Sequence, residues 1–315
     1  MKKQDFLSIE DLGKKEVMEI LHVARKLKSE LKNKGVNKLV LKNKTLIMMF
    51  EKPSLRTRLS FEIGITQLGG HAAYLGPSDI GLGVREPLGD IARVASRMGD
   101  LLLARVFKHD TVAELAKHSL VPVINGLSDT EHPCQALADA LTIMEHKGGF
   151  EGLRLAYIGD SENNVTHSLA LLSGLLGMHF ITASPKGYWM KKEIVANAEK
   201  LAKKSGATIT ETSDPHKAAK NADIIYTDTW VSMGDEAQKA KRLKVFRSYQ
   251  VTASLLKLAK KNAIFMHDLP AYRGNEVAPE VIDGPQSVVF QQAENRLHAQ
   301  KALLLYLMSD QEVCR

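Results

Sequence analysis

Two arginines and several hydroxyl groups lie close together in one short stretch of this 315-residue sequence, from Ser54 to Glu62 (SLRTRLSFE). The stretch follows TLIMMF, a continuous apolar run of strand length. Hydroxyls, guanidinium forks and the free amides of a first helical turn together bind phosphate and other anions. A capped helix with solvent-facing arginines is the alternative, but this density of polar groups after a buried strand favours an anion site.

Two further stretches carry groups that polarise oxygen. Arg105 ends the apolar run LLLAR and is followed by His109, and HPCQ begins a predicted helix. His132 and Gln135 lie one turn apart, so both can donate to an oxygen near that helix N-terminus. Taken singly, the arginine could pair with a core carboxylate and the histidine could be structural.

Two acidic loops follow apolar runs in the second half of the chain. DTWVSMG begins at Asp228 and offers a carboxylate, a hydroxyl and a glycine-ended loop, which suit an ammonium group; an ordinary acidic turn is the alternative. HDLPAYRG begins at His267 and places Asp268 in a turn stiffened by Pro270. A turn-capping role is the alternative for that carboxylate.

Short apolar runs alternating with helical patterns indicate the fold class, an α/β protein with two parallel-sheet domains. In such sheets ligands bind outside the carboxyl ends of the strands, where the polar stretches above fall. The Gly148-Gly149 break predicts a first domain over residues 1–147, completed by a C-terminal helix in 293–315, and a second over 148–292. The last helix has no strand after it, so we expect it to pack back on the first domain. Strands are expected at the following runs: 45–50, 72–75, 101–105, 121–125, 153–159, 179–183, 207–210, 223–227 and 263–267.

Two helix starts are predicted from capping patterns. Ser8 with Asp11 is expected to cap an amphipathic helix whose apolar stripe runs from Val17 to Leu27. Thr111 with Glu114 forms a T-x-x-E box that is expected to begin a helix ending near Ser119.

Composition excludes several classes of protein. Two cysteines, Cys134 and Cys314, rule out a disulfide framework and a cysteine-based zinc site. No apolar run is long enough to cross a membrane, and the N-terminal residues have neither an h-region nor transit composition, so a cytoplasmic location is expected. The +7 charge is scattered and aromatics make up 6%, which argues against nucleic-acid binding. GDSENNV after LRLAYI lacks the glycine pattern of dinucleotide sites.

Together these motifs resemble one family, the aspartate/ornithine carbamoyltransferases. The resemblance covers nearly the whole chain, and the combination of SLRTR with HPCQ is its most specific part. DTWVSMG is similar to the loop by which the ornithine branch differs from the aspartate branch. The motifs on which the resemblance rests occur in the family's order and spacing: SLRTRLSFE, Arg105 with His109, HPCQALAD, GDSENNVTHS, DTWVSMG, HDLPAYRG and ENRLHAQKALL.

The resemblance implies roles for individual residues. Carbamoyl phosphate would be held by Ser54, Leu55, Arg56, Thr57, Arg105, His132, Gln135, Leu269 and Arg296. Ornithine would be held by Asn164, Asp228, Ser232, Met233 and Asp268. Arg105, His132 and Asp268 would be the catalytic residues, with neither a metal nor an organic cofactor.

Three positions depart from the family pattern. Leu55 replaces a threonine, which shifts phosphate binding towards backbone amides. Asp268 replaces the cysteine of H-C-L-P, at the place where the acceptor amine reacts. Gly81 replaces a polar residue that reaches into a neighbouring subunit, a contact that Arg85 could supply.

The implied reaction is transfer of a carbamoyl group from carbamoyl phosphate to the δ-amine of ornithine, giving citrulline and phosphate. The implied assembly is a homotrimer or a multiple of trimers. Two alternatives stay open: another amine acceptor, such as putrescine or a modified ornithine, and a non-catalytic relative that binds carbamoyl phosphate.

Overall fold

The computed structural model describes residues 4–231 and 236–308, which form two compact units. One unit is built from the chain up to Leu141 together with the segment that begins at Glu294. The other is built from Thr142–Ala293. Each unit contains one parallel sheet covered by helices, which confirms the predicted fold class.

The first unit is organised around a four-stranded sheet with strand order β2-β1-β3-β4. All three strand pairings are parallel, and β1, β3 and β4 are buried almost throughout, as apolar strands covered on both faces must be. The strands are β1 (Thr45–Phe50), β2 (His71–Leu75), β3 (Leu101–Arg105) and β4 (Val123–Leu127).

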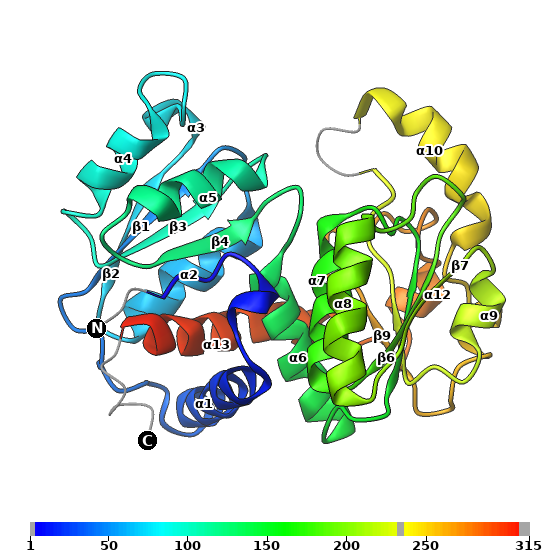
Figure 1. The fold of residues 1–315 in the computed structure, drawn as a ribbon. Helices are drawn as coiled ribbons and strands as arrows, with labels where there is room; N and C mark the ends of the chain where they lie inside the picture. Colours follow the sequence, from blue (N-terminus) through cyan, green and yellow to red (C-terminus); the bar gives the residue numbers. More distant parts are fainter. Residues whose placement is uncertain (1–3, 232–235, 309–315) are drawn as a thin grey trace. The chain divides into compact units, whose positions relative to one another are not determined.

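Helices cover both faces of this sheet (Figure 1). On one face, α4 and α5 pack their apolar sides on alternate residues of the strands, including Ile47, Leu102 and Val123. The other face is covered by α1, α2 and α13 (Figure 1). The helices of this unit are η1 (Ile9–Asp11), α1 (Lys14–Lys34), α2 (Leu55–Gln67), α3 (Pro77–Ile80), α4 (Leu88–Ala95), α5 (His109–His118), α6 (Pro133–Lys147) and α13 (Val289–Met308), of which α6 and α13 extend beyond it.

The last helix, α13, returns to the first unit as predicted. Lys301 is fully buried, and its Nζ donates to Asn37 Oδ1 at 2.7 Å and to Gln67 Oε1 at 2.9 Å. A Cβ on Gly64 of α2 would meet Lys301 Cγ at 3.2 Å, so a glycine lets the two helices approach closely. The closing helix is therefore fixed against α2, whose first turn carries the SLRTR sequence.

The second unit contains a five-stranded parallel sheet with strand order β7-β6-β5-β8-β9. The chain order reverses direction between β5 and β8, which makes their carboxyl ends the switch point where ligands bind in open α/β sheets. The strands are β5 (Arg154–Ile158), β6 (His179–Ala183), β7 (Ile209–Thr212), β8 (Ile224–Tyr226) and β9 (Ile264–Met266). The helices are α7 (Asn164–Leu176), α8 (Lys192–Ser205), α9 (Pro215–Ala219), η2 (Glu236–Gln238), α10 (Lys239–Phe246), η3 (Arg247–Tyr249), α11 (Ala253–Leu256) and α12 (Pro279–Ile282).

Two predicted helix starts were wrong. The Ser8–Asp11 capping box exists, but it caps the short η1, and α1 begins separately at Lys14 after Gly13. The helix predicted from Thr111 begins at His109, because Asp129 Oδ1 accepts from the His109 amide at 2.9 Å and caps it from outside. Strands β4 and β7 each begin and end two residues later in the chain than predicted.

No described helix is long and apolar enough to span a lipid bilayer.

Candidate functional site

The SLRTR sequence forms the first turn of α2, directly after β1. Ser54 is the N-cap, and its hydroxyl accepts from the Thr57 amide at 3.3 Å. Arg56 is half-buried and Thr57 is buried, whereas the Leu55 side chain is 69% exposed. Since Leu55 points to solvent, its replacement of a hydroxyl leaves the helix amides as the polar groups at that position.

Thr57 is the point at which three elements of the first unit converge. Its Oγ1 accepts from Arg105 NH1 at 3.3 Å and from Arg296 NH2 at 3.2 Å. Arg105 comes from the end of β3 and Arg296 from α13, and both are buried. A hydroxyl has two acceptor lone pairs and one proton, so these two contacts leave the Thr57 proton directed away from both guanidinium groups.

His132 is close enough to Arg105 and Arg296 for their positive charges to act on its imidazole. It precedes α6, whose helix begins at Pro133, and it is buried. Burial lowers its pKa well below the usual value, and the nearby charges of Arg296, Arg105, Lys52 and Arg56 lower this pKa further. His132 is therefore neutral at physiological pH and can donate one N–H without carrying a charge.

Gln135 is engaged at both ends of its amide. Its Oε1 accepts from Arg296 NH1 at 2.6 Å, and its Nε2 donates to Asp139 Oδ1 at 2.9 Å. Both partners of the amide are buried, as is Gln135 itself. The structure thus brings Thr57, Arg105, His132, Gln135 and Arg296 together, all within the first unit.

Two residues of this cluster were missed by the sequence analysis, Lys52 and Asp139. Lys52 is 8% exposed, and burial lowers its pKa to about 8, with a contribution from the charge of Arg105. Its Nζ also lies 4.9 Å from the centre of the Phe107 ring. The sequence did contain a signal for each residue: Lys52 stands two positions before Ser54, and Asp139 stands one helical turn after Gln135.

In the second unit, Asp228 follows β8 and is held by neighbours on two elements. Its Oδ1 accepts from the Thr229 amide at 2.6 Å, and its Oδ2 accepts from Asn163 Nδ2 at 3.1 Å. Asn163 is the N-cap of α7, where its Oδ1 accepts from the Thr166 amide at 2.8 Å. Asn164, the predicted ornithine contact, is the first residue of that helix and is half-buried. Asn163 is missed by the sequence analysis, although its position just before the helix is an N-cap signal.

Asp268 follows β9 and lies beside Asp228. The nearest ligand atoms of Asp228, His267 and Asp268 all lie within 4.8 Å of one another. Burial raises the pKa of Asp228 well above its usual value, and the negative charge of Asp268 raises this pKa further. Oδ1 of Asp268 is buried and accepts no hydrogen bond from any residue in the described part of the chain. Two carboxyl groups that repel each other favour the entry of a cation between them.

The loop that carries Asp268 is fixed by the imidazole of His267. Its Nδ1 accepts from the Leu269 amide at 2.9 Å, so this nitrogen carries no proton. The same Nδ1 lies 3.6 Å from Asp268 Oδ1, a separation that therefore joins no ion pair. Because its lone pair is already used, Nδ1 is unavailable as a metal ligand. Leu269 itself has a φ of 60° and precedes a cis peptide bond to Pro270.

Ser232 and Met233, the other two predicted ornithine contacts, lie outside the described residues. His109 begins α5, and its Nδ1 lies 2.9 Å from Ser128 Oγ.

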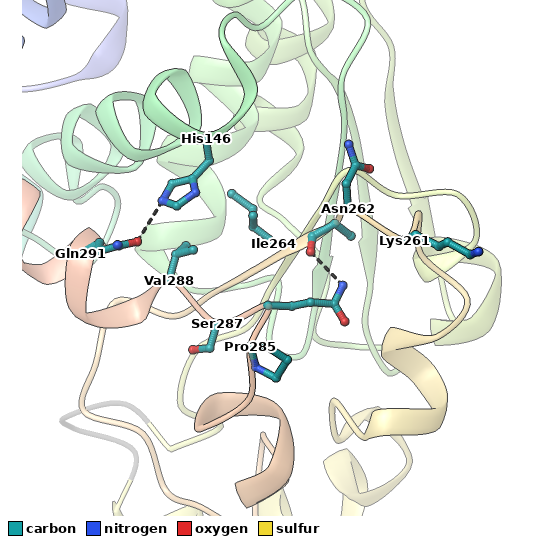
Figure 2. A pocket seen from close by; sticks show the side chains of 10 residues that line it. His146, Lys261, Asn262, Ile264, Pro285, Ser287, Val288 and Gln291 are labelled. Atoms are coloured by element: carbon teal, nitrogen blue, oxygen red, sulfur yellow. Dashed lines mark hydrogen bonds between the residues drawn. The ribbon is translucent and has the colours of Figure 1, made fainter.

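A pocket of about 420 Å³ lies at the start of β9, the end opposite to the one that Asp268 follows (Figure 2). It is lined in part by His146 and Gln291, whose side chains are hydrogen-bonded at 2.9 Å, and by Lys261 and Asn262. Lys261 and Asn262 precede the strand, whereas Asp268 follows it, so this pocket is separate from the carboxylate pair.

Comparison with known proteins explains the pattern of residues. The carbamoyl-P binding domain of the aspartate/ornithine carbamoyltransferases matches residues 4–145, and their Asp/Orn binding domain matches residues 151–307. The chain belongs to the aspartate/ornithine carbamoyltransferase family. The Asp/Orn binding model extends through most of α13, although the residues from Glu294 onward cluster in space with the first unit.

Relatives in this carbamoyltransferase family are similar over nearly the whole chain. An ornithine carbamoyltransferase of Methanosarcina acetivorans is 55% identical over 97% of this chain and 99% of its own. One of Anoxybacillus flavithermus is 51% identical over 98% of both chains. The solved ornithine carbamoyltransferase from Pyrococcus furiosus is 49% identical, covers 97% of both chains and superposes with a TM-score of 0.94.

Proposed function

We propose that this chain transfers the carbamoyl group of carbamoyl phosphate to the δ-amine of L-ornithine, releasing L-citrulline and phosphate. The δ-amine attacks the carbonyl carbon, the C–N bond forms, and negative charge develops on the carbonyl oxygen. The C–O bond to phosphate then breaks, and the amine loses a proton. The observation that carries this proposal is the cluster of buried donors around Thr57 in a chain of this family.

The first unit supplies groups suited to carbamoyl phosphate. The first-turn amides of α2 and the guanidinium of Arg56 suit the phosphate dianion. Arg105, neutral His132 and the proton of Thr57 are donors suited to the developing carbonyl oxyanion, where a preorganised donor is worth about 2.7–4 kcal/mol. Arg296 and Gln135 complete the set. For the domain that binds carbamoyl phosphate we retain residues 1–147 with 293–315.

The second unit supplies groups suited to ornithine, for which we retain 148–292. Asp228, oriented by Asn163 and the Thr229 amide, suits an ammonium group of the amino acid. Asn164, Ser232, Met233 and Leu269 stay predicted contacts of the substrates. Two observations support a role for Asp268 at the acceptor amine: its carboxylate lies close to that of Asp228, and its buried Oδ1 has no hydrogen-bond donor among the residues described.

The direct test is turnover with the purified chain. Carbamoyl phosphate and L-ornithine should give citrulline and phosphate in equal amounts, measured by mass spectrometry and a phosphate assay. Putrescine in place of ornithine tests the alternative acceptor, because putrescine lacks the α-ammonium and carboxylate groups. A higher kcat/KM with putrescine would transfer the assignment to that acceptor, and the absence of both products would overturn the enzyme assignment.

We further propose that the chain assembles as a homotrimer or a multiple of trimers. An apolar stripe on α2 is solvent-exposed in the single chain: Leu55, Leu59 and Ile63 are 69%, 46% and 41% exposed at successive helical turns. Such a stripe is typical of a surface covered by another subunit. Light scattering should give the mass of three chains, or of a multiple of three, and Leu59→Lys should lower it. A monomeric wild-type protein would contradict the assembly.

A further inference from the structure

Asp139 is a buried carboxylate that the functions assigned above do not use. It lies on α6 one turn after Gln135 and has no exposed surface. Its Oδ1 accepts from Gln135 Nε2 at 2.9 Å. A fully buried carboxylate is costly to retain unless its contacts are needed.

The contact with Asp139 determines which way the Gln135 amide faces. An amide has one donor end and one acceptor end, and a carboxylate can only accept. Nε2 must therefore face Asp139, and Oε1 is left for Arg296 NH1 at 2.6 Å. With the amide reversed, its NH₂ would face a guanidinium, which has only donors.

The Gln135 amide in turn orients Arg296. One guanidinium nitrogen, NH1, donates to Gln135 Oε1 and the other, NH2, donates to Thr57 Oγ1 at 3.2 Å. Both of these acceptors are neutral, so they orient the guanidinium without cancelling its charge. The carboxylate of Asp139 is one side chain further away, on the other end of the amide.

We propose that Asp139 is a positioning residue for the carbamoyl phosphate site: by holding the Gln135 amide, it fixes Arg296 on Thr57. It is not a catalytic residue, because the contact that links it to the site is made to Gln135 and not to the substrate. The identity of the substrate in this inference rests on the proposed function. The series of contacts from Asp139 through Gln135 and Arg296 to Thr57 does not depend on it.

The experiment combines Asp139→Asn, Gln135→Ala and the double variant with the wild-type chain. Binding of inorganic phosphate is measured by calorimetry, and KM and kcat are measured with carbamoyl phosphate and ornithine. Asp139→Asn removes the charge and offers Gln135 a donor end as well as an acceptor end, so the Gln135 amide is no longer held in one orientation. This variant is expected to weaken phosphate binding and raise KM for carbamoyl phosphate by up to about tenfold, the scale of one hydrogen bond to a charged group. KM for ornithine should stay near the wild-type value. In the double variant, phosphate binding should match that of Gln135→Ala alone, because Asp139 has lost its route to the site.

Asp223→Asn is the matched control. Asp223 is also buried, and it accepts from the Arg154 amide at 3.0 Å and from Lys260 Nζ at 2.9 Å, all within the second unit. This variant should lower the melting temperature without changing phosphate binding. If Asp139→Asn does not fold, Asp139→Ser is used in the same cycle.

Phosphate binding unchanged in Asp139→Asn would overturn the proposal, and so would independent, additive losses in the double variant. A general loss of stability with equal changes in both KM values would also overturn it. Because phosphate binding is measured without turnover, a wild-type chain that makes no citrulline would defeat the proposed reaction and leave the positioning role testable.

Discussion

Thr57 and Arg296 are separated by 239 positions in the chain, yet Arg296 NH2 lies 3.2 Å from Thr57 Oγ1. The contact joins the first turn of α2 to the closing helix α13. Arg105 NH1 donates to the same oxygen, so the two guanidinium groups use both lone pairs of the Thr57 hydroxyl. The hydroxyl can then still act as a donor.

Removing the Thr57 hydroxyl should therefore damage turnover without altering side-chain shape. We expect Thr57→Val to lower kcat/KM for carbamoyl phosphate by about 100-fold, since a donor is lost and two guanidinium N–H groups lose an acceptor. Thr57→Ser keeps the hydroxyl and should stay close to wild type. Equal activity of the valine and serine variants would show that the hydroxyl has no function.

Arginines in and around the first turn of α2 should differ in importance. Arg56→Ala and Arg105→Ala are each expected to lower kcat/KM by 10²-fold or more, on the scale of about 2.7–4 kcal/mol for a lost preorganised donor, with the fold intact by circular dichroism. Arg58 is the matched control because it faces outward, with Nε 2.9 Å from Glu62 Oε2. If Arg58→Ala is as inactive as Arg56→Ala in the monodisperse protein, position on α2 rather than contact with substrate explains the loss.

The pH dependence of kcat should show the effect of Asp268. A carboxylate beside the attacking amine favours the unreactive ammonium, so kcat should rise with pH. Asp268→Cys and Asp268→Asn should move that rising limb to lower pH. If the carboxylate is instead a required base, Asp268→Asn should collapse kcat. Three superimposable profiles would mean that Asp268 takes no part in the chemistry.

His132 should not titrate near neutrality. Burial and then the four surrounding cations hold its pKa well below 6.5, so the neutral donor form persists as the pH falls through that value. The kcat/KM profile for carbamoyl phosphate should show no inflection there that depends on His132. An inflection near 6.5 that is lost in His132→Gln but kept in the control His109→Gln would contradict this.

Lys301 should make stability depend on alkaline pH. Burial lowers its pKa from 10.5 to about 8 in the folded chain. Between these values the unfolded chain binds more protons, so the free energy of unfolding should rise as pH increases from about 8 towards 10.5. Urea titrations should show a smaller rise in Lys301→Met, with the rise due to Lys52, whose pKa is also about 8, left in place. An identical pH dependence in both proteins would exclude a contribution from Lys301.

Much of the fold could be predicted from the sequence because the signals are local. Continuous apolar runs such as TLIMMF predict buried parallel strands, and Ser54 predicts the start of α2 because its hydroxyl reaches an amide only three residues away. The helix start predicted at Thr111 failed because the cap of α5 comes from Asp129, which local patterns do not contain.

The sequence by itself determined which residue types stand at the ends of which strands, and the resemblance carried by SLRTR and HPCQ, because these are properties of adjacent residues. Only the tertiary structure decided which of them share a hydrogen bond. The link from Asp139 through Gln135 to Arg296 depends on the return of α13, and the repulsion between Asp228 and Asp268 depends on β8 and β9 being neighbours. Hydrogen bonds and charge interactions act over a few ångströms in space, whatever the separation of their residues along the chain.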